Sequence, residues 1–349
     1  MIYLEYAATN PFTKYPCSQY GQFLNPNANY AYKEQKLLDD CASRVKAAIG
    51  AKSGKVVFGG TSSQLIENLM NRAKRNTVIC SEYEHDSFFR YNYDAVGKIE
   101  EIPNSIANMP ESYGKMLVMW QGVNNITGEI FPVEQIGSIC HGFNSFYICD
   151  MTAMIGKAPI PANIDQWCDC AVWSGHKLGT ELSIGAMWIS DRLDKWLNGF
   201  KLHGTPNLAG ALAMTQAVED ACDKVVIDKK DYHWIGLADI MYRTLEKANI
   251  DYVMIPDRLV TYTYAINAIR LPGFNADALQ QHLASKQIYV SIGGSACAER
   301  HDYRVLNAYG LSNDEASEVI RVSFGEDSSV EDVKALVEGI KNFKELYVK

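Results

Sequence analysis

The stretch CAVWSGHKLG, residues 170–179, begins like a buried β-strand and then breaks into a serine, a glycine, a histidine and a lysine. An apolar run of this length bounded by turn residues is typical of a buried strand. Lys177 therefore follows a strand end, with Ser174 and His176 beside it. Ligands of open α/β sheets bind at strand ends, so the stretch predicts that Lys177 holds a cofactor.

Five more apolar runs of strand length lie on either side of this stretch. They are KVVFGG (55–60), NTVICSE (76–82), KMLVMWQG (115–122), FYICD (146–150) and IGAMWIS (184–190). Most are separated by enough residues for a crossover helix, which predicts an α/β fold with a mainly parallel sheet. One such helix follows KVVFGG, because apolar residues recur on one helical face at Leu65, Ile66, Leu69, Met70 and Ala73.

After about residue 250 the pattern changes to shorter strands, such as YAINAIRL (264–271) and VIRVSFG (319–325), interleaved with helix candidates. We expect a large domain over residues 16–249 and a small α/β domain formed by residues 1–15 and 250–349. The last helix has a capping-box signal, since Ser328 or Ser329 is followed three residues later by Glu331 or Asp332.

The composition indicates which classes of binding partner are unfavourable for this protein. The 349 residues are 47% hydrophobic and carry a formal net charge of -8, which argues against nucleic acid or an anionic membrane as partner, since phosphate contacts need a basic surface. The N-terminus shows no signal peptide and no run is long enough to span a bilayer, so a cytoplasmic location is the default expectation. Most of the nine cysteines are expected to be reduced core residues. No metal site is expected, because Cys168 and Cys170 lack zinc-site spacing and a second pair.

The turn after KVVFGG contains three consecutive hydroxyl residues, Thr61, Ser62 and Ser63, at the start of the predicted helix. Unpaired N–H groups and the positive end of a helix favour a phosphate there. Ordinary helix capping by serine is the alternative. The turn is neither a P-loop nor a dinucleotide-binding GxGxxG motif.

Asp150 closes FYICD, and a carboxylate at the end of a buried strand is costly unless something pairs with it. By itself it is equally well explained as an N-cap. The combination is more informative. A phosphate site, a strand-end acid and a strand-end lysine are what pyridoxal 5'-phosphate (PLP) requires: an anion site, a partner for the ring nitrogen and a Schiff-base amine.

The chain resembles the class V, fold-type I PLP enzymes, specifically the cysteine desulfurases that supply sulphur for iron–sulphur cluster and thiocofactor synthesis. The resemblance runs almost end to end, through YLEYAATNP, NPNANY, SEYEH, GVNNITGEI, DMTAMIGKAPI, SGHKLG, HGTPN, GGSAC and VIRVSFG, in that order. It implies a fold-type I PLP-dependent transferase, with a mainly parallel central sheet in a large domain and a smaller C-terminal α/β domain.

Carried over residue by residue, the resemblance assigns Lys177 to the Schiff base, Ser174 and His176 to the cofactor phosphate, and Asp150 to the ring nitrogen. His85 in SEYEH would stack on the ring and relay protons.

The same resemblance places Asn125 near the ring oxygen and the substrate carboxylate, which Arg321 would clamp with its bidentate guanidinium. Thr205 would reach the phosphate of a neighbouring subunit, which implies a homodimer. Taken singly, His85, Asn125, Arg321 and Thr205 each also fit ordinary structural roles.

Cys297 lies among glycines and small residues in SIGGSACAER, a composition suited to a loop. Positive charge from Arg300 or His301 would favour its thiolate, whereas a lone cysteine is more often inert. At the position matching the family's GSAC motif, Cys297 is the expected nucleophile. The implied reaction takes sulphur from L-cysteine, gives L-alanine and a Cys297 persulfide, and passes the sulphur to an acceptor protein.

The sequence departs from the family at several points. Ala153 stands where the family has a glutamine, GTELSIG replaces the usual GPKG, GGTSSQ replaces a GATES-like turn, and the segment after Cys297 is about two residues shorter. Two alternatives therefore remain open. One is another class V PLP enzyme, namely an aminotransferase, a C–S lyase or an amino-acid epimerase. The other is a pseudoenzyme that keeps the fold as a binding protein.

Overall fold

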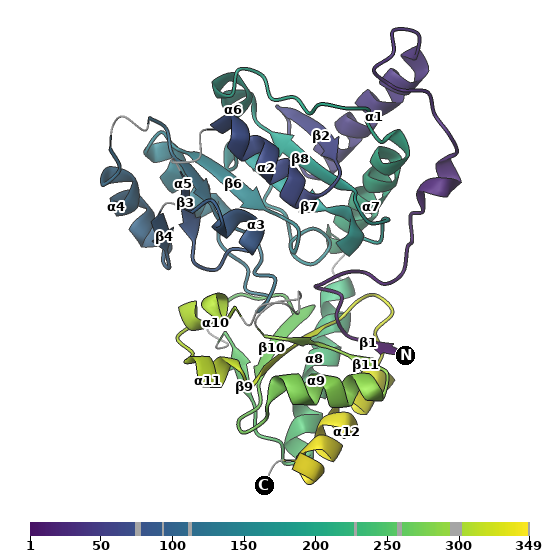
Figure 1. Cartoon of the computed structure of the whole chain (residues 1–349), viewed down its shortest axis with the longest axis vertical. Helices are drawn as coiled ribbons and strands as arrows, with labels where there is room; N and C mark the ends of the chain where they lie inside the picture. The colour runs from purple at the N-terminus through teal and green to yellow at the C-terminus, as the bar shows by residue number, and fades with distance from the viewer. Residues whose placement is uncertain are drawn as a thin grey trace. The chain divides into compact units, whose positions relative to one another are not determined.

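The computed structural model describes residues 1–73, 78–92, 94–110, 114–226, 229–256, 260–293 and 302–347. The chain divides into two compact units, each with its own sheet and helices (Figure 1). The larger unit comprises Phe12–Val123 and Phe131–Val226, and the smaller comprises Met1–Pro11, Asn124–Ile130 and Ile227–Lys349.

The larger unit is built on a seven-stranded sheet with the order β2-β8-β7-β6-β5-β3-β4. Neighbouring strands are parallel except β8, which is antiparallel to both β7 and β2. The predicted mainly parallel sheet is confirmed. β8 is reversed because only residues 175–184 join it to β7, too few for a crossover helix. The strands are β2 (Lys55–Gly59), β3 (Val78–Ser81), β4 (Asp94–Val96), β5 (Leu117–Met119), β6 (Phe146–Asp150), β7 (Cys170–Ser174) and β8 (Gly185–Ile189).

Helices pack against this sheet, α1 on β2, α2 on β7 and β8, and α5 on β6. The apolar face predicted for α2 is confirmed, because all five of its predicted core residues are buried. The α-helices are α1 (Tyr32–Ala48), α2 (Ser62–Ala73), α3 (Asp86–Phe89), α4 (Ile102–Ala107), α5 (Val133–Gly142), α6 (Asp191–Trp196) and α7 (Leu208–Val226). The 3-10 turns are η1 (Cys17–Tyr20), η2 (Ile99–Glu101), η4 (Ile164–Gln166) and η5 (Gly175–Lys177).

The smaller unit contains an antiparallel sheet of order β12-β13-β10-β9 and a parallel pair, β1 with β11. Its strands are β1 (Ile2–Tyr3), β9 (Val253–Ile255), β10 (Ile266–Arg270), β11 (Ile288–Tyr289), β12 (Ser291–Ile292) and β13 (Val319–Ser323). Its helices are α8 (Lys229–Lys247), α9 (Ala276–Ser285), α10 (Arg304–Ala308), α11 (Asn313–Ala316) and α12 (Val330–Tyr347). The predicted capping box of α12 forms between Ser329 and Asp332, whose backbone N–H groups each donate to the other's side chain.

The unit boundaries differ from those expected at residues 15 and 250. Helix α8 belongs to the smaller unit because it packs against α12. Residues 124–130 also belong to it, since Ile126 packs in an apolar cluster with Ile255, Ala268 and Leu306. Among the described residues, no helix is both long and apolar enough to cross a membrane.

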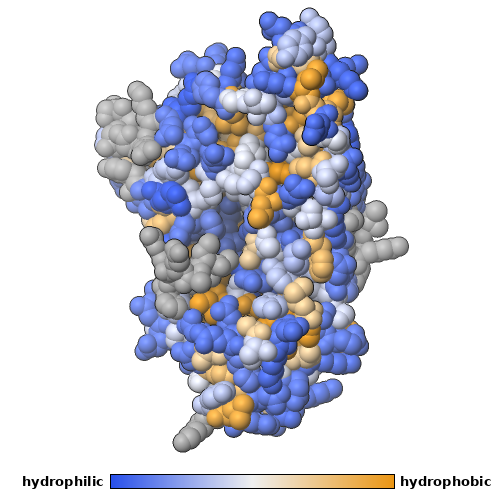
Figure 2. Space-filling model, turned by 45° about the vertical axis from the view of Figure 1, so that its right-hand side comes forward, coloured by the Kyte–Doolittle hydropathy of each residue, from blue (hydrophilic) through white to orange (hydrophobic). Residues whose placement is uncertain are grey.

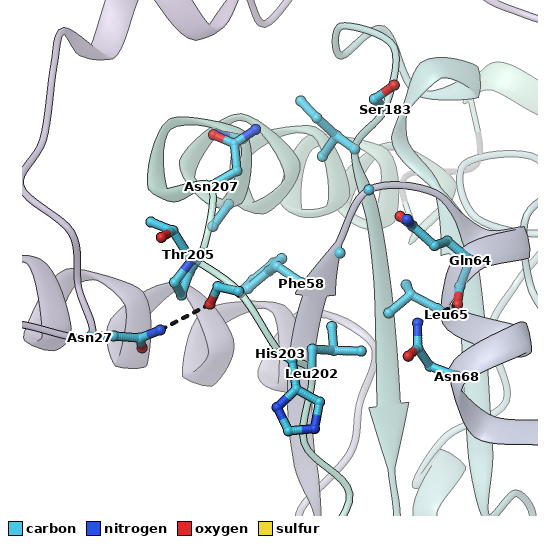
Figure 3. A pocket seen from close by; sticks show the side chains of 17 residues that line it. Asn27, Phe58, Gln64, Leu65, Asn68, Ser183, Leu202, His203, Thr205 and Asn207 are labelled. Atoms are coloured by element: carbon cyan, nitrogen blue, oxygen red, sulfur yellow. Dashed lines mark hydrogen bonds between the residues drawn. The ribbon is translucent and has the colours of Figure 1, made fainter. Parts of the chain in front are cut away.

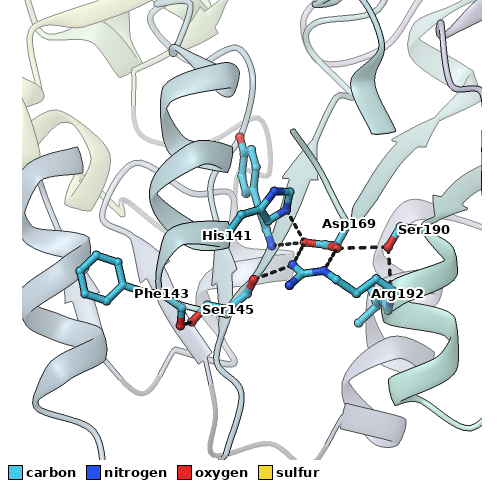
Figure 4. A network of polar contacts seen from close by, with 8 residues as sticks. His141, Phe143, Ser145, Asp169, Ser190 and Arg192 are labelled. Atoms are coloured by element: carbon cyan, nitrogen blue, oxygen red, sulfur yellow. Dashed lines mark hydrogen bonds and ion pairs between the residues drawn. The ribbon is translucent and has the colours of Figure 1, made fainter. Parts of the chain in front are cut away.

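Asp169, just before β7, is the buried centre of a polar network in the larger unit (Figure 4). Its carboxylate accepts two hydrogen bonds from Arg192, at 2.6 and 2.8 Å, and others from the Tyr147 N–H and the Ser190 hydroxyl. It also lies 3.1 Å from Nε2 of His141. Burial alone would raise the pKa of Asp169, but the bonds from His141 and Arg192 outweigh it and lower that pKa. The carboxylate therefore ties β6 to the start of β7.

We expect Asp169→Ala to lower the free energy of unfolding by about 3–5 kcal/mol, because Arg192 loses its buried partner. Asp239→Ala, which breaks the exposed pair with Arg243, should cost less than about 0.5 kcal/mol. Urea unfolding of both variants measures this. The difference should shrink in acid, since a carboxylate with a lowered pKa loses its contribution as pH falls below its unfolded value of about 4. Equal losses in the two variants would contradict the structural role of Asp169.

Candidate active site

The parallel strands of the larger unit place their carboxyl ends at one edge of the sheet. Because β8 is antiparallel to both β7 and β2, β2 also ends there. The predicted site residues of this unit lie at those ends: Thr61, Ser62 and Ser63 after β2, His85 after β3, Asp150 at the end of β6, Ser174 at the end of β7, and His176 and Lys177 after it. The fold thus gathers residues far apart in the sequence along one sheet edge.

The SGHK turn depends on Gly175. The N–H of Gly175 donates to the carbonyl of Ile184 at 2.8 Å. A Cβ atom at residue 175 would lie 2.3 Å from Oγ1 of Thr180 and 2.9 Å from Cε of Met214, so a larger residue does not fit. β7 can therefore end at Ser174 and pass at once into the 3-10 turn that carries half-buried Lys177.

The hydroxyl turn at the start of α2 is joined to the end of β7. The Ser62 and Ser174 hydroxyls are 2.6 Å apart, and the Ser62 N–H lies 3.4 Å from Oγ of Ser174. Thr61 caps the helix by accepting from the N–H of Gln64 at 3.1 Å, as in the capping alternative. Ser63 is exposed. Since the first-turn N–H groups of a helix have no intrahelical acceptor, this end of α2 retains donors for an anion.

His176 lies in an electropositive environment. Its pKa is lowered from 6.5 to about 4, chiefly by burial and also by the positive charges of Lys177 and Lys157. Its imidazole is therefore neutral at pH 7. Lys157, 7% exposed, was missed by sequence reasoning. Its only signal is a charge within the apolar run TAMIGKAPI.

Asp150 is 8% exposed at the end of β6. Its Oδ1 accepts from the N–H of Thr152 at 2.8 Å, whereas Oδ2 has no hydrogen bond to any described residue. The Thr152 hydroxyl is buried and likewise lacks a partner in the described part of the chain. A carboxylate oxygen left open in this way suits a protonated ring nitrogen, which carries one N–H to donate.

His85 caps the short helix α3. Its Nδ1 accepts from the Ser87 N–H at 3.2 Å, which leaves the proton of the neutral ring on Nε2. The side chain is exposed. Gln121, just after β5, donates from its backbone to the Glu84 carboxylate and from its side chain to the Tyr83 carbonyl. These bonds hold the segment before His85 beside the end of β5.

Two predicted substrate-binding residues meet in the smaller unit. Nη1 of Arg321, in β13, donates to the carbonyl of Asn125 at 2.9 Å. The amide Oδ1 of Asn125 is buried without a partner among the described residues. Cys297 lies in residues 294–301, outside the described residues.

Thr205 is exposed and forms no hydrogen bond with the other candidates in the described part of the chain. It lines a cavity of about 500 Å³ in the larger unit, together with Gly60 and Gln64 from the turn after β2 (Figure 3). The remaining polar lining consists mainly of neutral side chains, among them Asn27, Asn68 and Asn207.

The groups of the larger unit fit PLP. The α2 terminus with Ser174 offers donors to a phosphate, Asp150 offers an open carboxylate oxygen, and Lys177 offers an amine. These are three chemically different requirements, met along one edge of one sheet.

The lowered pKa of His176 predicts a pH effect on the cofactor-free protein. As pH falls from 6.5 toward about 4, the unfolded chain binds a proton at His176 that the folded chain does not, so the free energy of unfolding falls. His176→Gln should lose less stability than wild type over this range, measured by urea unfolding at each pH. His203→Gln, at an exposed position, controls for the loss of an imidazole. Parallel curves for wild type and His176→Gln would contradict the lowered pKa.

Comparisons with known proteins agree with this geometry. A cysteine desulfurase named IscS from Dictyoglomus turgidum is 25% identical over 95% of this chain and 91% of its own length. A putative cysteine desulfurase, IscS 1 of Bacillus subtilis, is 24% identical over 95% of this chain and 96% of its own.

Solved structures share the fold. A NifS-like protein from Rickettsia africae superimposes with a TM-score of 0.81 at 21% identity, covering 99% of both chains. The cysteine desulfurase CsdA of Escherichia coli gives a TM-score of 0.73 at 17% identity over 99% of this chain and 95% of its own. The family model for class-V aminotransferases, which are PLP-dependent enzymes, matches residues 2–336. The chain belongs to the class-V aminotransferase family.

Proposed function

We propose that this protein is a PLP-dependent cysteine desulfurase, which takes sulphur from L-cysteine and releases L-alanine. The observation that carries the proposal is the pair of neighbouring parallel strands β6 and β7, ending at Asp150 and at the turn with Lys177. The full-length similarity to proteins named cysteine desulfurase supports the choice of reaction.

Within the larger unit, Lys177 would hold PLP through its amine, and Asp150 would accept the ring N–H. Ser174, neutral His176 and the hydroxyl turn at Thr61, Ser62 and Ser63 would bind the phosphate. When bound, PLP withdraws electrons from the substrate Cα. Lys177 would remove and return the Cα proton. His85, whose Nδ1 accepts from the Ser87 N–H and so leaves the proton of a neutral ring on Nε2, would stack on the cofactor and relay protons.

Arg321 and Asn125 would bind the substrate carboxylate. Arg321 retains N–H donors that have no acceptor among the described residues, and Asn125 contacts it directly. The Cys297 thiolate would attack the substrate sulphur. An S–S bond forms as the C–S bond breaks, and its electron pair stays with the carbon fragment that becomes alanine. The outer sulphur of the persulfide would then be passed to an acceptor protein with Cys297 leaving as the thiolate, as the family resemblance implies for iron–sulphur cluster or thiocofactor synthesis.

The proposed assembly is a homodimer in which Thr205 reaches the partner's phosphate. Thr205 is an exposed hydroxyl beside the cavity near the hydroxyl turn. Large apolar side chains are exposed on the same unit at Leu24, Tyr30, Tyr32 and Leu182. Figure 2 shows hydrophobic patches interrupting the otherwise hydrophilic surface of one face. Such patches favour contact with another protein surface.

Borohydride reduction followed by peptide mass spectrometry should place PLP on Lys177. Lys177→Ala should lose this linkage and slow alanine formation about 10³-fold, because the amine both holds the cofactor and moves the Cα proton. Lys157→Gln, at the second lysine near His176, should keep the linkage. PLP attached to Lys157 in the wild type would refute the assignment.

Cys297→Ser should keep the cofactor and bind L-cysteine, yet form no persulfide and make alanine about 100-fold more slowly, since a hydroxyl attacks sulphur poorly. Cys17→Ser is the control, because burial and a hydrogen bond to Glu181 raise the pKa of that thiol to about 11 and keep it protonated. Alanine made at the wild-type rate by Cys297→Ser would instead favour a C–S lyase.

Light scattering should give twice the mass of the chain for the holoenzyme. Thr205→Ala should leave the dimer intact and weaken PLP binding about tenfold, the cost of one hydrogen bond to a charged group. Ser43→Ala, an exposed hydroxyl on α1, should change neither property. A fully active monomer would refute the shared site.

A further inference from the structure

Arg321 in β13 is the most buried cation of the smaller unit's predicted site, at 1% exposure. Among the described residues, its two hydrogen-bond partners are uncharged: Nη1 donates to the Asn125 carbonyl at 2.9 Å, and Nη2 donates to Oγ of Ser291 at 2.8 Å. Nε is buried and has no partner in the described part of the chain. A buried guanidinium whose direct partners are neutral needs a compensating charge from another source.

Glu5 provides that negative charge, and the Ser291 hydroxyl lies between its carboxylate and the guanidinium of Arg321. The Ser291 hydroxyl donates its proton to Oε1 of Glu5, while its oxygen accepts from Nη2 of Arg321. The three side chains form the chain Glu5–Ser291–Arg321. Burial lowers the pKa of Arg321, and the negative charge of Glu5 opposes that effect.

Strand pairing brings the three residues together. Ser291 in β12 lies directly opposite Arg321 in β13. The N-terminal segment runs parallel to β13 with Glu5 opposite Ser323, two residues beyond Arg321 and hence on the same face of the sheet. The Ala7 N–H donates to the Ser323 hydroxyl at 2.9 Å and fixes this segment.

The serine between the two charges matters for ligand binding. A carboxylate in direct bidentate contact would occupy the guanidinium fork that a substrate carboxylate needs. With Ser291 as a spacer, Arg321 uses one N–H on each Nη. Nε–H and the second N–H of each Nη have no acceptor in the described residues. Glu5 thus compensates the charge without filling the fork.

We propose that Glu5 is a positioning residue that acts through Ser291 to compensate the buried charge of Arg321 and to orient its guanidinium for the α-carboxylate of an amino-acid substrate. The proposal rests on the proposed function, in which Arg321 binds that carboxylate. Glu5 therefore sets substrate affinity and takes no part in the chemical step.

The test compares holoenzyme variants in steady-state kinetics with L-cysteine and in absorbance titrations with L-alanine and with cysteamine, an amine that lacks the α-carboxylate. Glu5→Gln should raise KM for L-cysteine and weaken L-alanine binding by the same factor, about tenfold, because it removes the charge behind Arg321. Turnover should stay within about twofold and cysteamine binding should not change, since neither depends on Arg321. Ser291→Ala, which keeps both charges but breaks the chain of hydrogen bonds, should act in the same direction.

The matched control is Glu318→Gln, which weakens another arginine–carboxylate pair of the smaller unit, Arg270 with Glu318 at 2.7 Å, and should leave KM unchanged. Arg321→Gln distinguishes the positioning role of Glu5 from the substrate-binding role of Arg321. If Arg321→Gln raises KM but neither Glu5→Gln nor Ser291→Ala does, the positioning role is wrong and the proposed function stands. If Arg321→Gln itself leaves KM and L-alanine binding unchanged, the carboxylate assignment of Arg321 is wrong, and the role of Glu5 falls with it. Equal weakening of cysteamine and L-alanine in Glu5→Gln would also overturn the proposal.

Discussion

The parallel pairing of β6 with β7 is the constraint on which the proposed site depends. It sets Asp150 opposite Val172, so that the acid and the turn with Ser174 and Lys177 leave the sheet at the same edge. Both strands are buried along their whole length, which fixes their register, because a slip of one residue would turn every side chain to the other face. The distance between acid and amine thus follows from the packing of the core.

The opposite ends of these strands are held by a different interaction. Asp169 joins the backbone of β6 to Arg192 and His141, and burial of that carboxylate makes the connection costly to break. The proposed ligand-binding groups therefore lie at one end of the strands and a stabilising ionic network lies at the other. The smaller unit has its own polar network, in which a carboxylate compensates a buried arginine through a hydroxyl.

Local patterns in the sequence predicted every strand of the larger sheet except β4, together with the buried face of α2, the α12 capping box and the strand-end positions of Asp150 and Lys177. Contacts between distant residues could not be predicted this way. The sequence around Glu5 contains no pattern that predicts its hydrogen bond with Ser291, which lies 286 positions away. The membership of α8 in the smaller unit depends on its packing with α12. The environment of Lys157 depends on the turn that brings it near His176.

The most direct test is the turnover of Asp150→Asn, because the open oxygen of Asp150 is the group proposed to pair with the ring nitrogen of the cofactor. PLP should remain attached to Lys177 while alanine formation from L-cysteine falls about 100-fold or more, since the charge at the ring nitrogen is lost. Asp165→Asn, at a carboxylate that bonds Ser53 on the surface, should turn over normally. Near-normal turnover by Asp150→Asn would show that the ring nitrogen does not lie at the end of β6.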